Sequence, residues 1–150
     1  MSQSLAKIVI HVVYGTKNRE PFLEKSIRAK LYAYTVGILD TLNCITIAIN
    51  GVEDHLHLLV ILSKNITVSK MLEEIKKGTS RWLKTQGNNF NGFSWQSGYG
   101  AFSVSESQIP KVIEYINNQE QHHQKISFQD ELRALLKKHH IEFNEQYLWS

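Results

Sequence analysis

Two histidines, His55 and His57, are separated by a single leucine in the apolar segment 55–62 (HLHLLVIL), which has the length and composition of a β-strand. Successive side chains of a strand point to opposite faces, so both imidazoles share one face, about 6.6 Å apart along the chain. Two imidazoles at this spacing can bind one divalent metal ion. Two histidines that only form hydrogen bonds at the start of a strand produce the same pattern, and the pair alone does not distinguish the two cases.

Three polar residues, Tyr115, Gln119 and His122, occupy positions i, i+4 and i+7 of a segment with helical periodicity that runs from Pro110 to about His123. They form one stripe beside the apolar face of that helix. A tyrosine oxygen can attack phosphorus when it is aligned in line and the phosphate charge is neutralised. A glutamine one turn away offers a neutral oxygen ligand, if the stripe faces the histidine pair. Otherwise Tyr115 is an aromatic residue at the rim of the core.

The two patterns occur together in a known superfamily. His55-Leu56-His57 is its His-hydrophobe-His (HUH) signature on a strand, and residues 115–119 (YINNQ) match its single-tyrosine helix, with a glutamine four residues after the tyrosine. The chain resembles the small single-tyrosine HUH transposases of insertion sequences that move as single-stranded DNA. The resemblance covers roughly residues 5–124, including TKNRE after the first strand and WQSGYGAFSV before the tyrosine helix.

The resemblance implies a DNA transposase that cleaves and rejoins single-stranded DNA at insertion-sequence ends. It implies Tyr115 as the nucleophile of a 5′-phosphotyrosine intermediate, and His55, His57 and Gln119 as ligands of Mg²⁺ or Mn²⁺. Imidazole favours softer ions, whereas phosphate and amide oxygens favour these two metals. The implied partners are single-stranded DNA, as hairpin ends of a mobile element, and a second copy of the chain. In such a homodimer the tyrosine helix can serve the other subunit's histidines.

The periodicity predicts an α+β domain with a ferredoxin-like, RRM-like antiparallel sheet, helices on one face and a separate tyrosine helix. We expect a single domain over residues 1–150, with a core at about 5–124 and a C-terminal helical extension at about 127–150. The role of this extension lies outside the resemblance. The expected strands are 5–14, 44–50, 55–62 and a hairpin of FSW and AFSV, and the expected helices are 23–42, 67–84, 110–123 and 128–140.

A basic stripe on the expected helix 67–84 is a candidate DNA contact. Segment 64–84 carries six basic and two acidic residues, a local charge of +4 against +3 for the whole chain. Such a stripe is often only a solvated surface, but beside a phosphate-cleaving site it also suits phosphate contact. The candidates for DNA binding are Lys70, Lys77, Arg81, Lys84 and, on the tyrosine stripe, His122. Trp95, Tyr99 and Phe102 could stack on bases, although core packing explains them equally well.

Composition limits the class of protein. The chain has 150 residues, 42% hydrophobic residues and a single cysteine, which excludes a disulfide-stapled secreted domain and a disordered tail. No apolar segment reaches the length of a membrane span, and the first residues lack the basic start of a signal peptide. We therefore expect a soluble cytoplasmic protein with no membrane partner, and the resemblance to insertion-sequence transposases implies a prokaryotic one. Among the other histidines, we expect His11 to be half-buried, and His123, His139 and His140 to lie in solvent.

Two other functions remain open on the residues alone. A non-catalytic single-strand nucleic-acid-binding module would use an RRM-like sheet, but no aromatic-rich strand of that class is present. A metal-dependent phosphoesterase would use water as the nucleophile, but the second His-x-Ser/Thr motif of a two-histidine-motif enzyme is missing.

Overall fold

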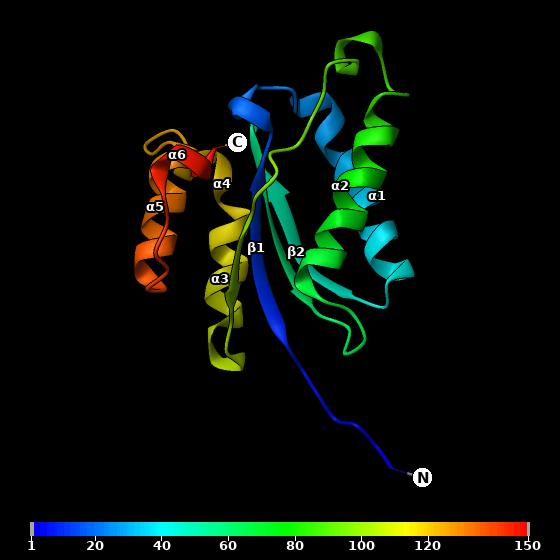
Figure 1. Cartoon of the computed structure of the whole chain (residues 1–150), viewed down its shortest axis with the longest axis vertical. Helices are drawn as coiled ribbons and strands as arrows, with labels where there is room; N and C mark the ends of the chain where they lie inside the picture. The colour runs from blue at the N-terminus through cyan, green and yellow to red at the C-terminus, as the bar shows by residue number, and fades with distance from the viewer. Residues whose placement is uncertain (1, 150) are drawn as a thin grey trace.

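The computed structural model describes residues 2–149 and has a four-stranded antiparallel sheet at its centre (Figure 1). The strand order is β2-β3-β1-β4, which is the order expected of a ferredoxin-like arrangement. The predicted α+β class is therefore confirmed. The strands are β1 (Val9–Gly15), β2 (Ile45–Gly51), β3 (His55–Ile61) and β4 (Gly100–Ser103).

Two helices, α1 (Lys25–Thr41) and α2 (Val68–Leu83), cover one face of the sheet. Alternate residues of β3, namely Leu56, Leu58 and Val60, are fully buried in the core beneath them, as the two-residue period predicts. The N-terminus of α2 is capped by Thr67, whose hydroxyl accepts a hydrogen bond from the backbone N–H of Lys70.

The opposite face is covered by the tyrosine helix and the C-terminal segment, which lie side by side in Figure 1. One small core on this face contains Val9, Leu59 and Ile116. A second contains Val13 and Phe102, which pack with the C-terminal segment. The helices of this layer are α3 (Ile109–Asn117), α4 (Gln119–His122), α5 (Phe128–Lys138) and α6 (Glu145–Leu148). Short 3₁₀ turns occur at Lys17–Arg19 (η1), Asn88–Phe90 (η2) and Glu106–Gln108 (η3).

The predicted FSW–AFSV hairpin is wrong. Only Gly100–Ser103 forms a strand, whereas Trp95 makes a single bridge with Thr16, and Gln96 N–H donates to the Gly15 carbonyl at the end of β1. The next carbonyls are held by the ammonium of Lys76, which lies 2.9 Å from the oxygens of both Gln96 and Gly98. This segment therefore crosses toward α2 instead of folding back on β4.

The tyrosine helix is interrupted rather than continuous to His123. Helix α3 ends at Asn117 and α4 begins at Gln119. At the break, the side-chain amide of Asn50 on β2 donates to the carbonyls of both Ile116 and Asn117. This contact ties the end of α3 to the sheet near the histidine end of β3, where Asn50 pairs with His57. None of the helices within residues 2–149 is long and apolar enough to cross a membrane.

Candidate active site

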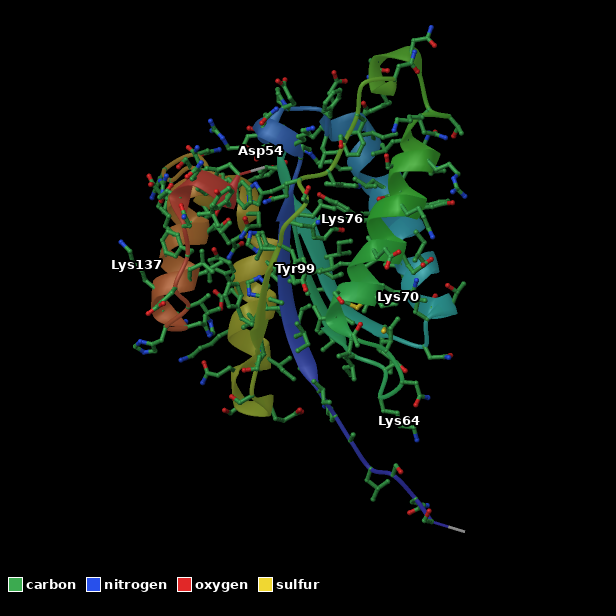
Figure 2. All side chains as sticks on the ribbon, in the orientation of Figure 1. Asp54, Lys64, Lys70, Lys76, Tyr99 and Lys137 are labelled. Carbon is green, nitrogen blue, oxygen red and sulfur yellow. The ribbon has the colours of Figure 1, made fainter. Side chains whose placement is uncertain are left out.

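The histidine pair lies at the start of β3 on the face covered by α3 and α5. Both His55 and His57 are completely buried. Their ring nitrogens on the strand side are held in place: His55 Nδ1 lies 2.7 Å from the carboxylate of Asp54, and His57 Nδ1 lies 2.9 Å from Nε2 of His11 on β1. Figure 2 shows Asp54 at this end of the sheet. Partners of this kind orient an imidazole and leave its Nε2 available to a metal.

The two Nε2 atoms point at the carboxylate of Glu131 on α5. Glu131 Oε1 lies 3.1 Å from His55 Nε2, 2.9 Å from His57 Nε2 and 2.9 Å from Nε2 of His123. Glu131 itself is only 2% exposed. One carboxylate oxygen is therefore surrounded by three imidazoles.

Helix α5 reaches this position because β1 ends in glycine. A side chain at Gly15 would collide with the Phe128 ring and the Gln96 side chain, since its Cβ would lie 2.6 Å and 2.8 Å from their nearest atoms. Phe128 instead stacks on His55, with ring centroids 4.1 Å apart and planes 10° apart. Glu131 follows three residues later on the same side of α5 and thereby reaches the histidines.

Tyr115 joins the same group of residues. Its hydroxyl donates a hydrogen bond to Glu131 Oε2, and its ring lies edge-on to His57, with centroids 5.6 Å apart. His122 Nε2 lies 3.2 Å from the same carboxylate oxygen, and its ring centroid is 5.3 Å from that of Tyr115. Tyr115 and His122 of the tyrosine stripe thus lie beside the histidine pair.

The surroundings shift the ionisation of these groups. Burial lowers the pKa of His57 to about 4 and, together with the nearby His57, that of His11 to about 3. The imidazoles of His57 and His11 are therefore neutral at pH 7, and the neutral form of an imidazole is the one that binds metals. Burial opposes ionisation of Glu131, but hydrogen bonds from His123, His55 and His57 outweigh it and hold the pKa of its carboxyl well below the usual range. Burial and the negative charge of Glu131 raise the pKa of Tyr115, so its hydroxyl keeps its proton.

The donor set fits a divalent metal ion. Four side chains each offer one ligand atom, and these atoms all lie within 4.8 Å of one another: His55, His57, His123 and Glu131. Four of the distances between these ligand atoms are 2.9–3.1 Å. In a tetrahedral site with bonds of about 2.1 Å, ligand atoms are about 3.4 Å apart, so small shifts would suffice. Three imidazoles with one carboxylate suit Mn²⁺, Fe²⁺ or Zn²⁺ better than Mg²⁺.

Gln119, the third ligand implied by the resemblance, lies at the start of α4 and is fully buried. Its Nε2 donates to the carbonyl of Tyr115, 3.2 Å away, while its Oε1 has no hydrogen-bond partner within residues 2–149. A buried oxygen without a partner is rare and costly, so Gln119 retains a free oxygen ligand.

The basic stripe lies elsewhere. The stripe lies along α2, on the face of the sheet opposite α3 and its Tyr115 (Figure 1). It consists of three residues of the helix and its C-cap residue, namely Lys70, Lys77, Arg81 and Lys84. Lys70 and Lys77 both pair with Glu74, at 3.1 Å and 3.4 Å, which neutralises part of the stripe. Of the DNA-binding candidates, only His122 shares the neighbourhood of the tyrosine. Trp95 and Phe102 are buried in the core, whereas Tyr99 is exposed.

Sequence reasoning missed three residues of this cluster. His123 was expected in solvent, which is wrong because its side chain is 9% exposed and contacts Glu131. His11 was expected to be half-buried, which is also wrong, since it is 4% exposed beside His57. Glu131 was not considered, although a carboxylate between Phe128 and Leu132 on the apolar side of an amphipathic helix is a recognisable signal.

Comparisons with known proteins identify the family of this chain. The sequence model of the family described as "Transposase IS200 like" matches residues 4–119. No protein in a curated collection is significantly similar in sequence.

Two solved structures share the fold. One is a candidate transposase from Deinococcus radiodurans R1, with 20% identity, 79% of this chain and 98% of the other covered, and a TM-score of 0.62. The second is a REP-associated tyrosine transposase bound to a REP hairpin, with 16% identity, 84% and 76% covered, and a TM-score of 0.61. The family match includes Tyr115 and the histidine pair and ends before His123 and Glu131. This chain belongs to the IS200-like transposase family.

Proposed function

We propose that this transposase cleaves and rejoins single-stranded DNA at the ends of an insertion sequence through a 5′-phosphotyrosine on Tyr115. One observation carries the proposal. The Tyr115 hydroxyl and the Nε2 atoms of His55 and His57 converge on a single carboxylate, that of Glu131, so a nucleophile and a metal-binding group share one site.

His55 and His57 would hold a divalent ion, with Gln119 as the third ligand implied by family resemblance and with His123 and Glu131 as further donors. The bound ion would neutralise charge on the scissile phosphate. Asp54 and His11 keep the two imidazoles oriented, because each holds the ring nitrogen that faces away from Glu131.

The chemistry of the chain itself centres on the tyrosine oxygen. Tyr115 Oη forms a bond to phosphorus, the bond from phosphorus to the 3′ oxygen breaks, and the phenolic proton is lost as the 3′ oxygen gains one. The products are a 5′-phosphotyrosine and a free 3′-OH. Attack by a 3′-OH on that linkage reverses the bond changes and rejoins DNA without an external energy source, because the phosphodiester energy is retained in the covalent intermediate.

The proposed partner is single-stranded DNA with hairpin ends, which is supported by the structural relative bound to a REP hairpin. The basic stripe on α2 would contact DNA away from the cleaved phosphate, because it lies on the other face of the sheet. A homodimer remains a proposal, as does location in the prokaryotic cytoplasm. The ring contact between Tyr115 and His57 within one chain supports a site that a single chain assembles.

Incubation with single-stranded hairpin DNA and Mn²⁺, followed by denaturing gel electrophoresis, tests the proposal. A covalent protein–DNA adduct is the expected result. Cleavage without an adduct would instead identify a phosphoesterase that uses water, and a binding shift without cleavage would identify a nucleic-acid-binding module.

A further inference from the structure

We propose that a cavity beside Tyr115 binds one unpaired nucleotide next to the scissile phosphate, with its base inserted between α3 and α5. The inference rests on the proposed function and assigns a specific subsite to the substrate strand. It also gives the C-terminal helix, which lies beyond the family match, a role in substrate binding.

The cavity has a volume of about 610 Å³ and lies between β4, α3 and α5. This size falls within the range of about 300–1,000 Å³ that is typical of small-ligand sites. Tyr115 forms part of its wall, so an occupant would lie directly against the nucleophile. α3 contributes Val112 and Tyr115 to the lining, and α5 contributes Leu135 and Lys138.

The walls suit a flat, aromatic occupant. The rings of His139 and Phe102 line the cavity and stack on each other, with centroids 4.5 Å apart and planes 24° apart. Phe102 is buried, so His139 is the ring of this pair that a base can reach. Val112 and Leu135 add apolar surface. Unpaired bases bind proteins mainly by stacking on aromatic and apolar side chains. Ser105 and Gln108 provide hydroxyl and amide groups that can reach the polar edge of a base.

The charge of the cavity suits a nucleotide rather than a neutral molecule. Lys111 and Lys138 line it and are exposed, so their ammonium groups can meet backbone phosphates. Among the twelve described residues of the lining, none is acidic.

A second, smaller cavity of about 230 Å³ also has Tyr115 in its lining. It shares Tyr115, Leu135 and Lys138 with the first and is otherwise lined by residues farther along the chain, from His122 to Ala134. A scissile phosphate has one nucleotide on each side, and two cavities adjoin the proposed nucleophile. The larger, more aromatic cavity takes the base.

Nuclear magnetic resonance of the full chain tests the subsite without requiring cleavage. The probes are the four deoxynucleoside 5′-monophosphates, with deoxyribose 5-phosphate as the control that lacks a base. We expect amide shifts grouped at residues 102–105, 111–112 and 138–139, with at least one nucleotide binding about tenfold more tightly than the sugar phosphate, as base stacking provides.

Two variants locate the binding. Val112→Trp fills the cavity and should abolish the grouped shifts, with a thermal melt to verify folding. Lys138→Glu should weaken nucleotide binding, whereas Lys137→Glu should not, because Lys137 lies on the outer side of α5 (Figure 2) and is absent from the lining. Lys138 is exposed, so its replacement leaves the core intact.

Equal binding of nucleotide and sugar phosphate, or shifts away from these residues, would overturn the subsite. The adduct assay on hairpin DNA separates this result from failure of the proposed function. An adduct without grouped nucleotide shifts refutes only the subsite, whereas shifts without an adduct refute the covalent mechanism.

Discussion

The carboxylate of Glu131 links Tyr115 to His57. One of its oxygens accepts a hydrogen bond from the Tyr115 hydroxyl, and the other lies 2.9 Å from Nε2 of His57. It therefore stands between the nucleophile and the nitrogens that would bind a metal. A phosphate that approaches both groups must displace this carboxylate or meet it through a cation, because two adjacent anions repel each other. Under the proposed function, Glu131 would therefore have to move or bind a cation before DNA enters the site.

Tyr115→Phe should separate binding from chemistry. The change keeps the aromatic ring and removes only the phenolic oxygen, so cleavage and adduct formation should be lost while affinity for hairpin DNA stays within a few-fold of wild type. The free energy of unfolding should fall by about 1.5–3 kcal/mol, the typical size of a hydrogen bond to a charged group. Gel assays and thermal melts measure both effects, and persistent nicking by this variant would contradict the covalent mechanism.

A mixture of Tyr115→Phe and His57→Ala proteins should remain inactive. If Tyr115 acts with the His57 that its ring contacts in the same chain, a heterodimer of the two variants contains no complete site. Adduct formation after mixing and subunit exchange is the measurement. Restored activity would show that the tyrosine helix serves the partner's histidines, and a tethered dimer carrying both changes controls for failed exchange.

Metal binding should depend on α5 as well as on β3. His57→Ala should abolish Mn²⁺ binding measured by calorimetry, and Glu131→Gln should weaken it by about tenfold or more, since such a change removes an anionic donor. Asp130→Asn is the matched control, because Asp130 is exposed on the same helix and pairs with Arg133.

The same titration tests Gln119. If Gln119→Ala strongly lowers the affinity for Mn²⁺ and Glu131→Gln changes it little, the third metal ligand is on the tyrosine helix, as the family resemblance implies. Undiminished DNA cleavage by wild-type protein in excess chelator would contradict any metal requirement.

Replacing Lys77, Arg81 and Lys84 by alanine should reduce DNA affinity without slowing cleavage of bound DNA. The residues lie on the face of the sheet opposite Tyr115, so they can only contact DNA outside the scissile nucleotides. Each lost phosphate contact should lower the slope of log affinity against log salt by about 0.7 on single strands. An unchanged slope would mean that the stripe is only a solvated surface.

Lys76 should make stability depend on pH. Burial lowers the pKa of Lys76 to about 8 from its ordinary 10.5, so between these values the unfolded chain binds more protons than the folded one. The free energy of unfolding, relative to Lys76→Met, should therefore rise with pH from 8 to 10.5. Urea denaturation at several pH values checks this, and a difference that stays constant or falls would contradict the lowered pKa.

Local patterns were sufficient for much of the architecture. The two-residue alternation of β3 correctly divided Leu56 and Leu58 from His55 and His57, because a strand places alternate side chains on opposite faces whatever its neighbours are. The hydrogen bond by which Thr67 caps α2 is equally local, because it joins residues three positions apart. The same reasoning failed for the FSW–AFSV hairpin, since the carbonyls of Gln96 and Gly98 bind Lys76, twenty or more residues away in sequence.

The sequence by itself was sufficient to identify the family and its two motifs. Each motif, His55-Leu56-His57 and residues 115–119 (YINNQ), is a short pattern within one strand or helical segment. Only the tertiary structure decided what surrounds them. Because Gly15 has no side chain, Phe128 can stack on His55. Glu131 lies three residues after Phe128 on the same helix and contacts both His123 and Tyr115. These contacts join β1, β3, α3 and α5, and no periodicity within one segment specifies which buried polar group will meet another across the fold.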